Sequence, residues 1–343
     1  MMRRCGFDVA ANARRAGAAL LITLLLLGAG GCEDKNAAKP VSETRLLLDT
    51  FCSITIYAPQ DEELLSDAFG LCEELEALFS ISAEGSDVWN INHAHGEPVA
   101  VSPQTAELIR AGVEYGEMSG GMFDISIGRL STLWDFTGMS GVPAEADIAA
   151  ARETVDYRKI NIAGNVVQMG NADAWIDLGG IAKGYIADCI AEMLRGRGAT
   201  SAIIDLGGNI VTIGKKADGS LWKIGVTDPF GERTDLIGII ETGEASVVSA
   251  GTYERRFVVD GTAYHHILDP GTGMPVRSGV AGVTIVSESS MDGDALSTTL
   301  LLLGSGDAAA VVERAAGIEG AVLVTDGGEI HRFGDLVFTA IGG

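Results

Sequence analysis

The sequence predicts an α+β fold, a single domain of mixed, largely antiparallel sheets with packed helices. Predicted strands follow one another in runs, while the helices are few and grouped, so the chain does not alternate strand and helix as a doubly wound sheet would. The 343 residues are 47% apolar and 21% charged, as in a folded globular protein. The net charge of −23 repels phosphate backbones, which argues against general nucleic-acid binding, but it is compatible with a divalent cation.

The first residues are typical of an export signal. Residues 1–31 combine a basic start with an apolar run that is too short to span a bilayer. The small residues before Cys32 resemble a bacterial lipoprotein signal, in which this cysteine is lipidated and becomes the first residue, although Ala29 stands where leucine is usual. We therefore expect a tether over 32–44 and the catalytic domain over 45–343. The protein would then be exported and anchored on the periplasmic or outer side of the inner membrane; plain secretion and a retained anchor are the alternatives.

The first half of the domain predicts one strand and three helices. A β-branched, apolar run predicts the strand, and apolar residues at helical spacing predict the first helix. Ser102 as N-cap and Pro103 as first residue open the second helix. In order, these elements cover 45–57, 61–79, 102–118 and, after a glycine-rich stretch at 119–144, a short helix at 144–154.

From residue 159 the pattern becomes rich in strands. We predict strands near 159–169, 174–178, 201–206, 209–214, 221–227, 236–241, 245–249, 255–260, 263–268 and 280–286, and a final hairpin at 320–333. Helices are predicted at 181–196, 292–303 and 306–316.

The first candidate site lies where a predicted strand runs through Asp177 into Gly179 and Gly180 and a helix follows. Such a junction directs backbone N–H groups and the positive helix end at one spot, which suits an anion. Lys183 lies in the first helical turn, where a cation opposes the helix dipole, and a nearby phosphate would explain it. The alternative is a tight turn with a solvent-exposed lysine.

The second candidate is a pair of adjacent histidines, His265 and His266, on a strand that ends in an Asp-Pro-Gly turn. Adjacent residues of a strand point to opposite faces, so one imidazole can line a cleft while the other does not. Histidine is the side chain best suited to take a proton near neutral pH. An edge-strand pair beside a simple turn is the alternative.

The third candidate is the start of an apolar helix, where Asp294 and Thr298 are four residues apart and share one face. Their oxygens are hard ligands suited to Mg²⁺, but two side chains cannot complete its shell. A capped helix start is the alternative.

A fourth and weaker signal is the loop at 119–124, which could wall a flat ring or simply anchor a loop to the core.

Taken in order, these segments resemble the FAD:protein FMN transferase (ApbE) family. The matching stretches are SGGMFDIS, IDLGGIAKGYIAD, LGGNIVTIG, SAGTYERRF, HHILDPGTG and DGDALSTTLLLLG. The resemblance extends over residues 45–335. It implies a single α+β ApbE-like domain that binds FAD with Mg²⁺, releases AMP and attaches FMN to a threonine hydroxyl of a target protein. Implied targets are flavin-carrying subunits of respiratory redox complexes.

The resemblance also implies roles for individual residues. Mg²⁺ would bind the backbone oxygen of Ala182 and the side chains of Asp294 and Thr298, with Ser297 close enough to assist. His266 would be the catalytic base. FAD would contact Leu48, Met122, Phe123, Asp124, Asp177, Gly179, Lys183, Tyr185, His266 and Ile267.

Two departures from the family pattern concern the flavin. Leu48 stands where the family has methionine, and Ser82 aligns with a frequent flavin-stacking tyrosine. We expect the loss of this ring to weaken FAD binding by about 1 kcal/mol or more.

Three other functions stay open at this stage. The chain could be an Mg²⁺-dependent FAD pyrophosphatase that gives FMN and AMP, a lipoprotein that binds flavin without catalysis, or a solute-binding lipoprotein unrelated to flavin. The retained histidine and the Asp/Thr pair argue against the last two.

Overall fold

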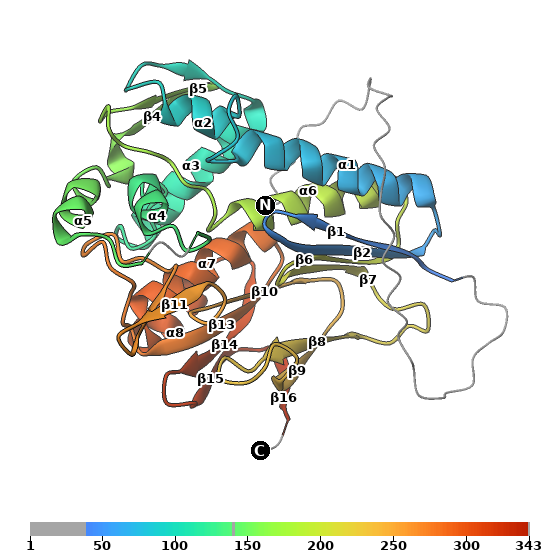
Figure 1. The fold of residues 1–343 in the computed structure, drawn as a ribbon. Coiled ribbons are helices and arrows are strands. Elements are labelled where there is room, and N and C mark those ends of the chain that lie inside the picture. The colour runs from blue at the N-terminus through green and yellow to red at the C-terminus, as the bar shows by residue number, and fades with distance from the viewer. Residues whose placement is uncertain (1–38, 139–140, 342–343) are drawn as a thin grey trace.

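The fold is centred on one eight-stranded sheet (Figure 1). The computed structural model describes residues 39–138 and 141–341, so the expected signal segment and Cys32 lie outside the described residues. The strand order is β1-β2-β6-β7-β10-β13-β14-β15, and each pair of neighbours is antiparallel, which confirms the predicted fold class. The strands are β1 (Val41–Leu47), β2 (Thr50–Ala58), β6 (Ser201–Leu206), β7 (Asn209–Gly214), β10 (Ser246–Gly251), β13 (Val280–Ser287), β14 (Ile318–Thr325) and β15 (Ile330–Gly334).

Helices cover one face of this sheet, with α1 and α6 lying above β1, β2 and β6 in Figure 1. Helix α1 buries an apolar stripe that includes Leu64, Ala68 and Leu75, as its spacing predicts. Helix α7 is apolar on nearly all sides, and such a helix is stable only inside a core. The helices of this layer are α1 (Glu62–Phe79), α6 (Ala182–Gly196), α7 (Ser290–Leu303) and α8 (Ser305–Arg314).

A three-stranded sheet, ordered β16-β9-β8, supplies a second apolar cluster with the large sheet. Trp222 and Ile240 of the small sheet pack in one cluster with Val247 and Val286 of the large one. The strands of the small sheet are β8 (Trp222–Thr227), β9 (Leu236–Thr242) and β16 (Val337–Ala340). Both faces of the large sheet therefore contribute to the core.

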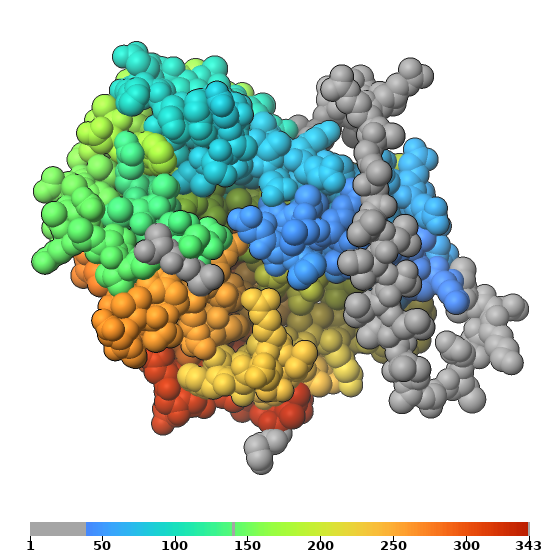
Figure 2. Space-filling model, in the orientation of Figure 1, coloured from blue at the N-terminus to red at the C-terminus, as the bar shows by residue number. Residues whose placement is uncertain are grey.

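The remaining elements gather at one end of the molecule, in the upper and left part of Figure 1. They are α2 (Asp87–Asn92), α3 (Pro103–Met118), α4 (Gly128–Trp134), α5 (Glu145–Arg152), a 3₁₀ turn η1 (Tyr157–Lys159), the sheet β3 (Val99–Ala100), β5 (Val166–Met169) and β4 (Ile160–Ala163), and the hairpin β11 (Arg256–Val259) and β12 (Thr262–His265). In Figure 2 the blue, green and orange parts of the chain border a hollow in this face.

Several predicted elements differ from the structure. The single strand predicted over 45–57 is the hairpin β1–β2, which turns at Leu48 and Asp49 with φ of 54° and 57°. Residues other than glycine rarely adopt this left-handed backbone. Because neither turn residue is a glycine, the sequence does not mark a hairpin turn at this place. Residues 174–178 form no strand, and the short elements α2, α4 and β16 were not predicted. Within the ranges that the structure describes, no helix has both the length and the apolar character needed to cross a membrane.

Candidate active site

The starts of helices α6 and α7 meet and bring two of the candidate segments together. The backbone N–H of Gly184 donates a hydrogen bond to Oδ2 of Asp294 over 2.9 Å. The ammonium of Lys183 lies 3.7 Å from Oδ1 of the same carboxylate. Asp294 is buried, whereas Lys183 is half-buried. The turn before α6, predicted to bind an anion, and the start of α7, predicted to hold a cation, therefore lie side by side and form one site. We call this site the α6–α7 junction.

Gly180 connects this site to the loop at 119–124. A Cβ atom at Gly180 would lie 3.1 Å from the ring of Phe123 and 3.7 Å from Oγ1 of Thr298. The glycine thus allows the α6 turn to lie between an aromatic ring and the α7 hydroxyl. The Phe123 side chain is itself buried in the main apolar cluster.

The two histidines have the different environments that their adjacent positions predict. His265 is buried, and its Nε2 lies 3.1 Å from the carbonyl oxygen of Val276. His266 is half-buried and follows β12, with its backbone N–H bonded to Arg255. Nδ1 of His266 is buried, and no residue in the described part of the chain hydrogen-bonds it. One ring nitrogen of His266 is therefore left without a hydrogen-bond partner among the described residues.

Burial first, and then the positive charge of Arg255, lowers the pKa of His266 to about 3. The neighbouring His265 and the ammonium of Lys183 lower it further. The influence of Lys183 links the histidine to the junction of α6 and α7. His266 is consequently a neutral imidazole near neutral pH, which is the form that accepts a proton.

Glu254 is a site carboxyl that the sequence did not single out, although it lies in the SAGTYERRF stretch. Glu254 is exposed at the surface as a residue, and desolvation of its carboxyl by the neighbouring chain raises its pKa. The positive charge of Lys183 lowers this pKa, and the negative charge of Asp294 raises it. Next to it, the guanidinium of Arg255 lies 4.0 Å from Asp49 at the tip of the β1–β2 hairpin. Leu48, in the same tip, donates its backbone N–H to Glu76 over 2.8 Å.

Other predicted flavin contacts are engaged within the protein. Asp124 accepts hydrogen bonds from Ser126 N and Oγ and from Tyr157 N, and burial raises its pKa. The hydroxyl of Tyr185 donates to Glu107 over 3.0 Å, with its ring buried in the helix layer. Asp177 accepts the N–H of the exposed Gly179 at 2.8 Å, which shapes the turn before α6. Met122 and Ile267 pack in the apolar cluster around α7.

The oxygen donors where α6 meets α7 are of the chemical kind that Mg²⁺ prefers. Among the described residues, no group of three or more His, Cys, Asp or Glu side chains could hold a metal ion. The donors that could hold such a cation are the Asp294 carboxylate, the Thr298 hydroxyl four residues later on α7, and the backbone oxygen of Ala182 in the first turn of α6. These are hard oxygen ligands, and the carboxylate already attracts one cation, Lys183. Ser297 is fully buried, and its hydroxyl donates to the Asp294 backbone oxygen over 2.8 Å.

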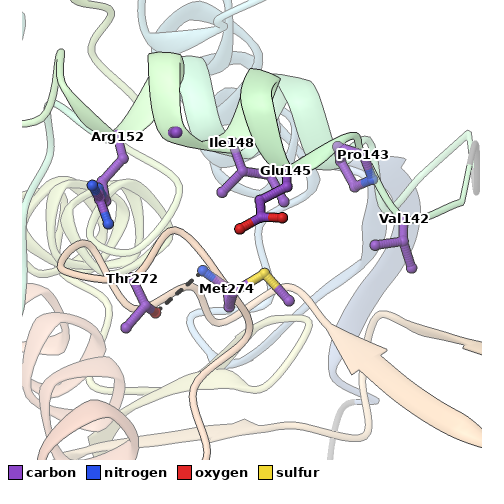
Figure 3. A pocket seen from close by; sticks show the side chains of 8 residues that line it. Val142, Pro143, Glu145, Ile148, Arg152, Thr272 and Met274 are labelled. Atoms are coloured by element: carbon purple, nitrogen blue, oxygen red, sulfur yellow. Dashed lines mark hydrogen bonds between the residues drawn. The ribbon is translucent and has the colours of Figure 1, made fainter.

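A cavity of about 530 Å³ lies outside this site, between α5 and the turn that follows His266 (Figure 3). Its wall includes Ile148 and Arg152 of α5 and Thr272 and Met274 of the turn. None of the residues predicted to bind FAD or Mg²⁺ lines it. It is therefore not the candidate active site.

The comparisons agree with the resemblance seen in the sequence. Residues 48–322 match the model of the ApbE family. A relative from Treponema pallidum, named FAD:protein FMN transferase, is 30% identical over 327 residues, covering 89% of this chain and 90% of the relative. One of the same name from Klebsiella pneumoniae is 36% identical over 294 residues, covering 84% and 90%.

Solved structures give the same result for the fold. An ApbE protein from Thermotoga maritima superposes with a TM-score of 0.80 at 34% identity, covering 86% of this chain and 97% of that one. The flavin transferase ApbE from Vibrio cholerae gives a TM-score of 0.76 at 26% identity, covering 86% and 96%.

Proposed function

The chain belongs to the ApbE family and is, like the relatives it matches, an FAD:protein FMN transferase; we propose how its own residues carry out that transfer. The observation that carries the proposal is the meeting of the Gly179–Lys183 segment with Asp294, tied by the bond from Gly184. Phosphate-binding backbone and an oxygen ligand for a cation thus lie side by side.

We propose that the turn at Gly179 and Gly180 and the ammonium of Lys183 hold the FAD diphosphate. Asp294, Thr298 and the backbone oxygen of Ala182 would hold Mg²⁺, and Ser297 would support them. Bound there, Mg²⁺ would neutralise charge that develops on the phosphate of the departing AMP. Phe123 and the segment at 266–267 would lie against the flavin, together with Leu48 from the hairpin tip.

His266 is proposed as the general base. Its neutral imidazole would take the proton of a threonine hydroxyl while that oxygen attacks the FMN phosphorus. A new P–O bond forms to the threonine, the bond to the bridging oxygen breaks, and AMP leaves with that oxygen. An unaided threonine hydroxyl is a weak nucleophile, which is why a positioned base is needed.

The partner and the location follow from the same proposal. The acceptor would be a flavin-carrying subunit of a respiratory redox complex, on the periplasmic or outer side of the inner membrane. A lipid on Cys32 and a tether over 32–44 would keep the enzyme at that membrane. The lipoprotein-like stretch before Cys32 supports this location.

One experiment tests the activity. The protein is incubated with FAD, MgCl₂ and a purified candidate acceptor subunit, and the denatured acceptor is examined for flavin fluorescence and mass. Transfer adds roughly 438 Da to a threonine, the mass of an FMN phosphoester. AMP and free FMN without an adduct would indicate a pyrophosphatase, and intact FAD would indicate a flavin-binding protein without catalysis.

A further inference from the structure

Helix α7, which carries Asp294 and Thr298, begins against a carboxylate of another helix. Asp188 of α6 accepts three hydrogen bonds there. Ser289 Oγ donates to its Oδ2 over 2.8 Å, Ser290 N to its Oδ1 over 2.8 Å, and Met291 N to its Oδ2 over 3.0 Å.

These bonds complete the hydrogen bonding of the first turn of α7. The first N–H groups of a helix have no partner within the helix. Asp188 accepts from Ser290 and Met291, while the N-cap Ser289 accepts from Asp292 N with its hydroxyl and from Gly293 N with its carbonyl. The start of α7 is therefore held by α6 as well as by its own cap.

The same two helices are joined again one turn away. On α6, Gly184 and Asp188 are four residues apart; on α7, Ser290 and Asp294 are four apart. Gly184 donates to Asp294, and Ser290 donates to Asp188, so the helices run antiparallel in a defined register. A Cβ atom at Gly184 would come within 2.2 Å of Ser290 O, which shows how closely they pack.

We propose that Asp188 is a positioning residue for the metal site, because it sets the place of α7 relative to α6 and thereby the place of Asp294 and Thr298. The proposal rests on the function and the Mg²⁺ site proposed above. Asp188 has no role in the chemistry itself. Burial raises its pKa to about 6, against the lowering effect of its three hydrogen bonds. Burying a carboxylate costs free energy unless hydrogen bonds compensate for the lost water. The three donors at the start of α7 provide this compensation, so the carboxylate and the helix start stabilise each other.

The test measures metal binding apart from catalysis. Mn²⁺, which accepts the same oxygen ligands as Mg²⁺, is titrated into the protein without flavin, and the free ion is followed by electron paramagnetic resonance. Asp188→Asn removes the carboxylate. Ser289→Ala removes one of its three donors and the N-cap while leaving every charge in place. Thermal unfolding is recorded for each variant.

The chain offers matched controls at the start of α3. There Asp87 accepts from Ser102 N over 2.8 Å and from Thr105 Oγ1 over 2.7 Å, and Ser102 is the N-cap. Asp87→Asn and Ser102→Ala therefore remove a carboxylate and an N-cap at another helix start, but α3 carries no proposed metal ligand.

We expect Asp188→Asn to raise the Mn²⁺ dissociation constant about tenfold. Ser289→Ala should raise it by a smaller factor, and the two controls should lose stability with unchanged Mn²⁺ binding. The proposal is overturned if Asp188→Asn and Ser289→Ala bind Mn²⁺ like wild type, or if the controls weaken binding equally. If Asp188→Asn does not fold, the Mn²⁺ dissociation constant of Ser289→Ala, compared with wild type, decides whether the proposal stands. Wild type that binds no Mn²⁺ would instead overturn the proposed metal site, and this inference with it.

Discussion

The N–H of Gly184 and the carboxylate of Asp294 are 110 residues apart in the chain and 2.9 Å apart in space. This one hydrogen bond joins the start of a helix that follows a diglycine turn to the face of the helix that carries Thr298. The bond depends on the absence of a side chain at residue 184, because the backbone of α7 passes directly over it.

Gly184→Ala is expected to destabilise the protein by about 3 kcal/mol, since the added methyl meets Ser290 O and Met291 Cα and forces the helices apart. Urea unfolding measures the change. Gly70→Ala is the matched control, because a Cβ at this glycine of α1 would meet nothing within 4 Å. It should stabilise by about 0.5–1 kcal/mol through helix propensity alone. Equal effects at the two glycines would contradict the close approach.

His266→Ala is expected to lower FMN transfer by about 100-fold or more and to leave FAD binding intact, because it removes the proposed base. The measurements are a transfer assay and isothermal titration with FAD. His265→Asn is the control, since this neighbour is buried and its ring bonds Val276. It should cost stability but retain transfer. Transfer by His266→Ala at the wild-type rate would remove His266 from the mechanism.

Asp294→Ala is expected to raise the Mg²⁺ concentration needed for half-maximal transfer by about tenfold or more, because it removes the only carboxylate of the proposed ligand set. Asp292→Asn is the control two residues earlier, where the carboxylate accepts a hydrogen bond from Tyr115. That variant should keep the wild-type Mg²⁺ requirement. A wild-type Mg²⁺ requirement in Asp294→Ala would show that the metal binds elsewhere.

The lowered pKa values of the two histidines predict how stability depends on pH. Burial lowers the pKa of His266 to about 3 and that of His265 to about 4 in the folded protein, against a pKa of about 6.5 for an unfolded histidine. Between these values the unfolded state binds more protons, so these groups make the free energy of unfolding fall as pH drops below about 6.5.

The check compares wild type with His265→Asn by urea unfolding at several pH values. Because the variant lacks one of these groups, its unfolding free energy should fall less steeply between pH 6.5 and 4 than that of wild type. Parallel curves would mean that His265 is protonated as readily in the folded chain as in the unfolded one.

The sequence indicates which segments could carry the proposed chemistry more readily than it indicates how the fold holds those segments together. Helix geometry places Asp294 and Thr298 on one face, and strand geometry points the two histidines to opposite faces, so both features can be predicted from a short stretch of sequence. The hydrogen bonds between Asp188 and the start of α7 cannot be predicted in this way, because they depend on how two distant helices pack. The turn at Leu48 was missed for another reason: its left-handed backbone is held by surrounding contacts, and no glycine marks it.

The sheet order has a consequence for how this protein is made. Strand β2, near the start of the domain, pairs with β6, which comes about 150 residues later in the chain. The contact between Gly184 and Asp294 can form only after helix α7, near the end of the chain, has been made. Contacts so distant along the chain form slowly, because long loops must close first. A chain that is still being synthesised, or one truncated before residue 294, therefore has only the α6 part of the proposed site. We expect neither of them to bind the metal or to cleave a dinucleotide.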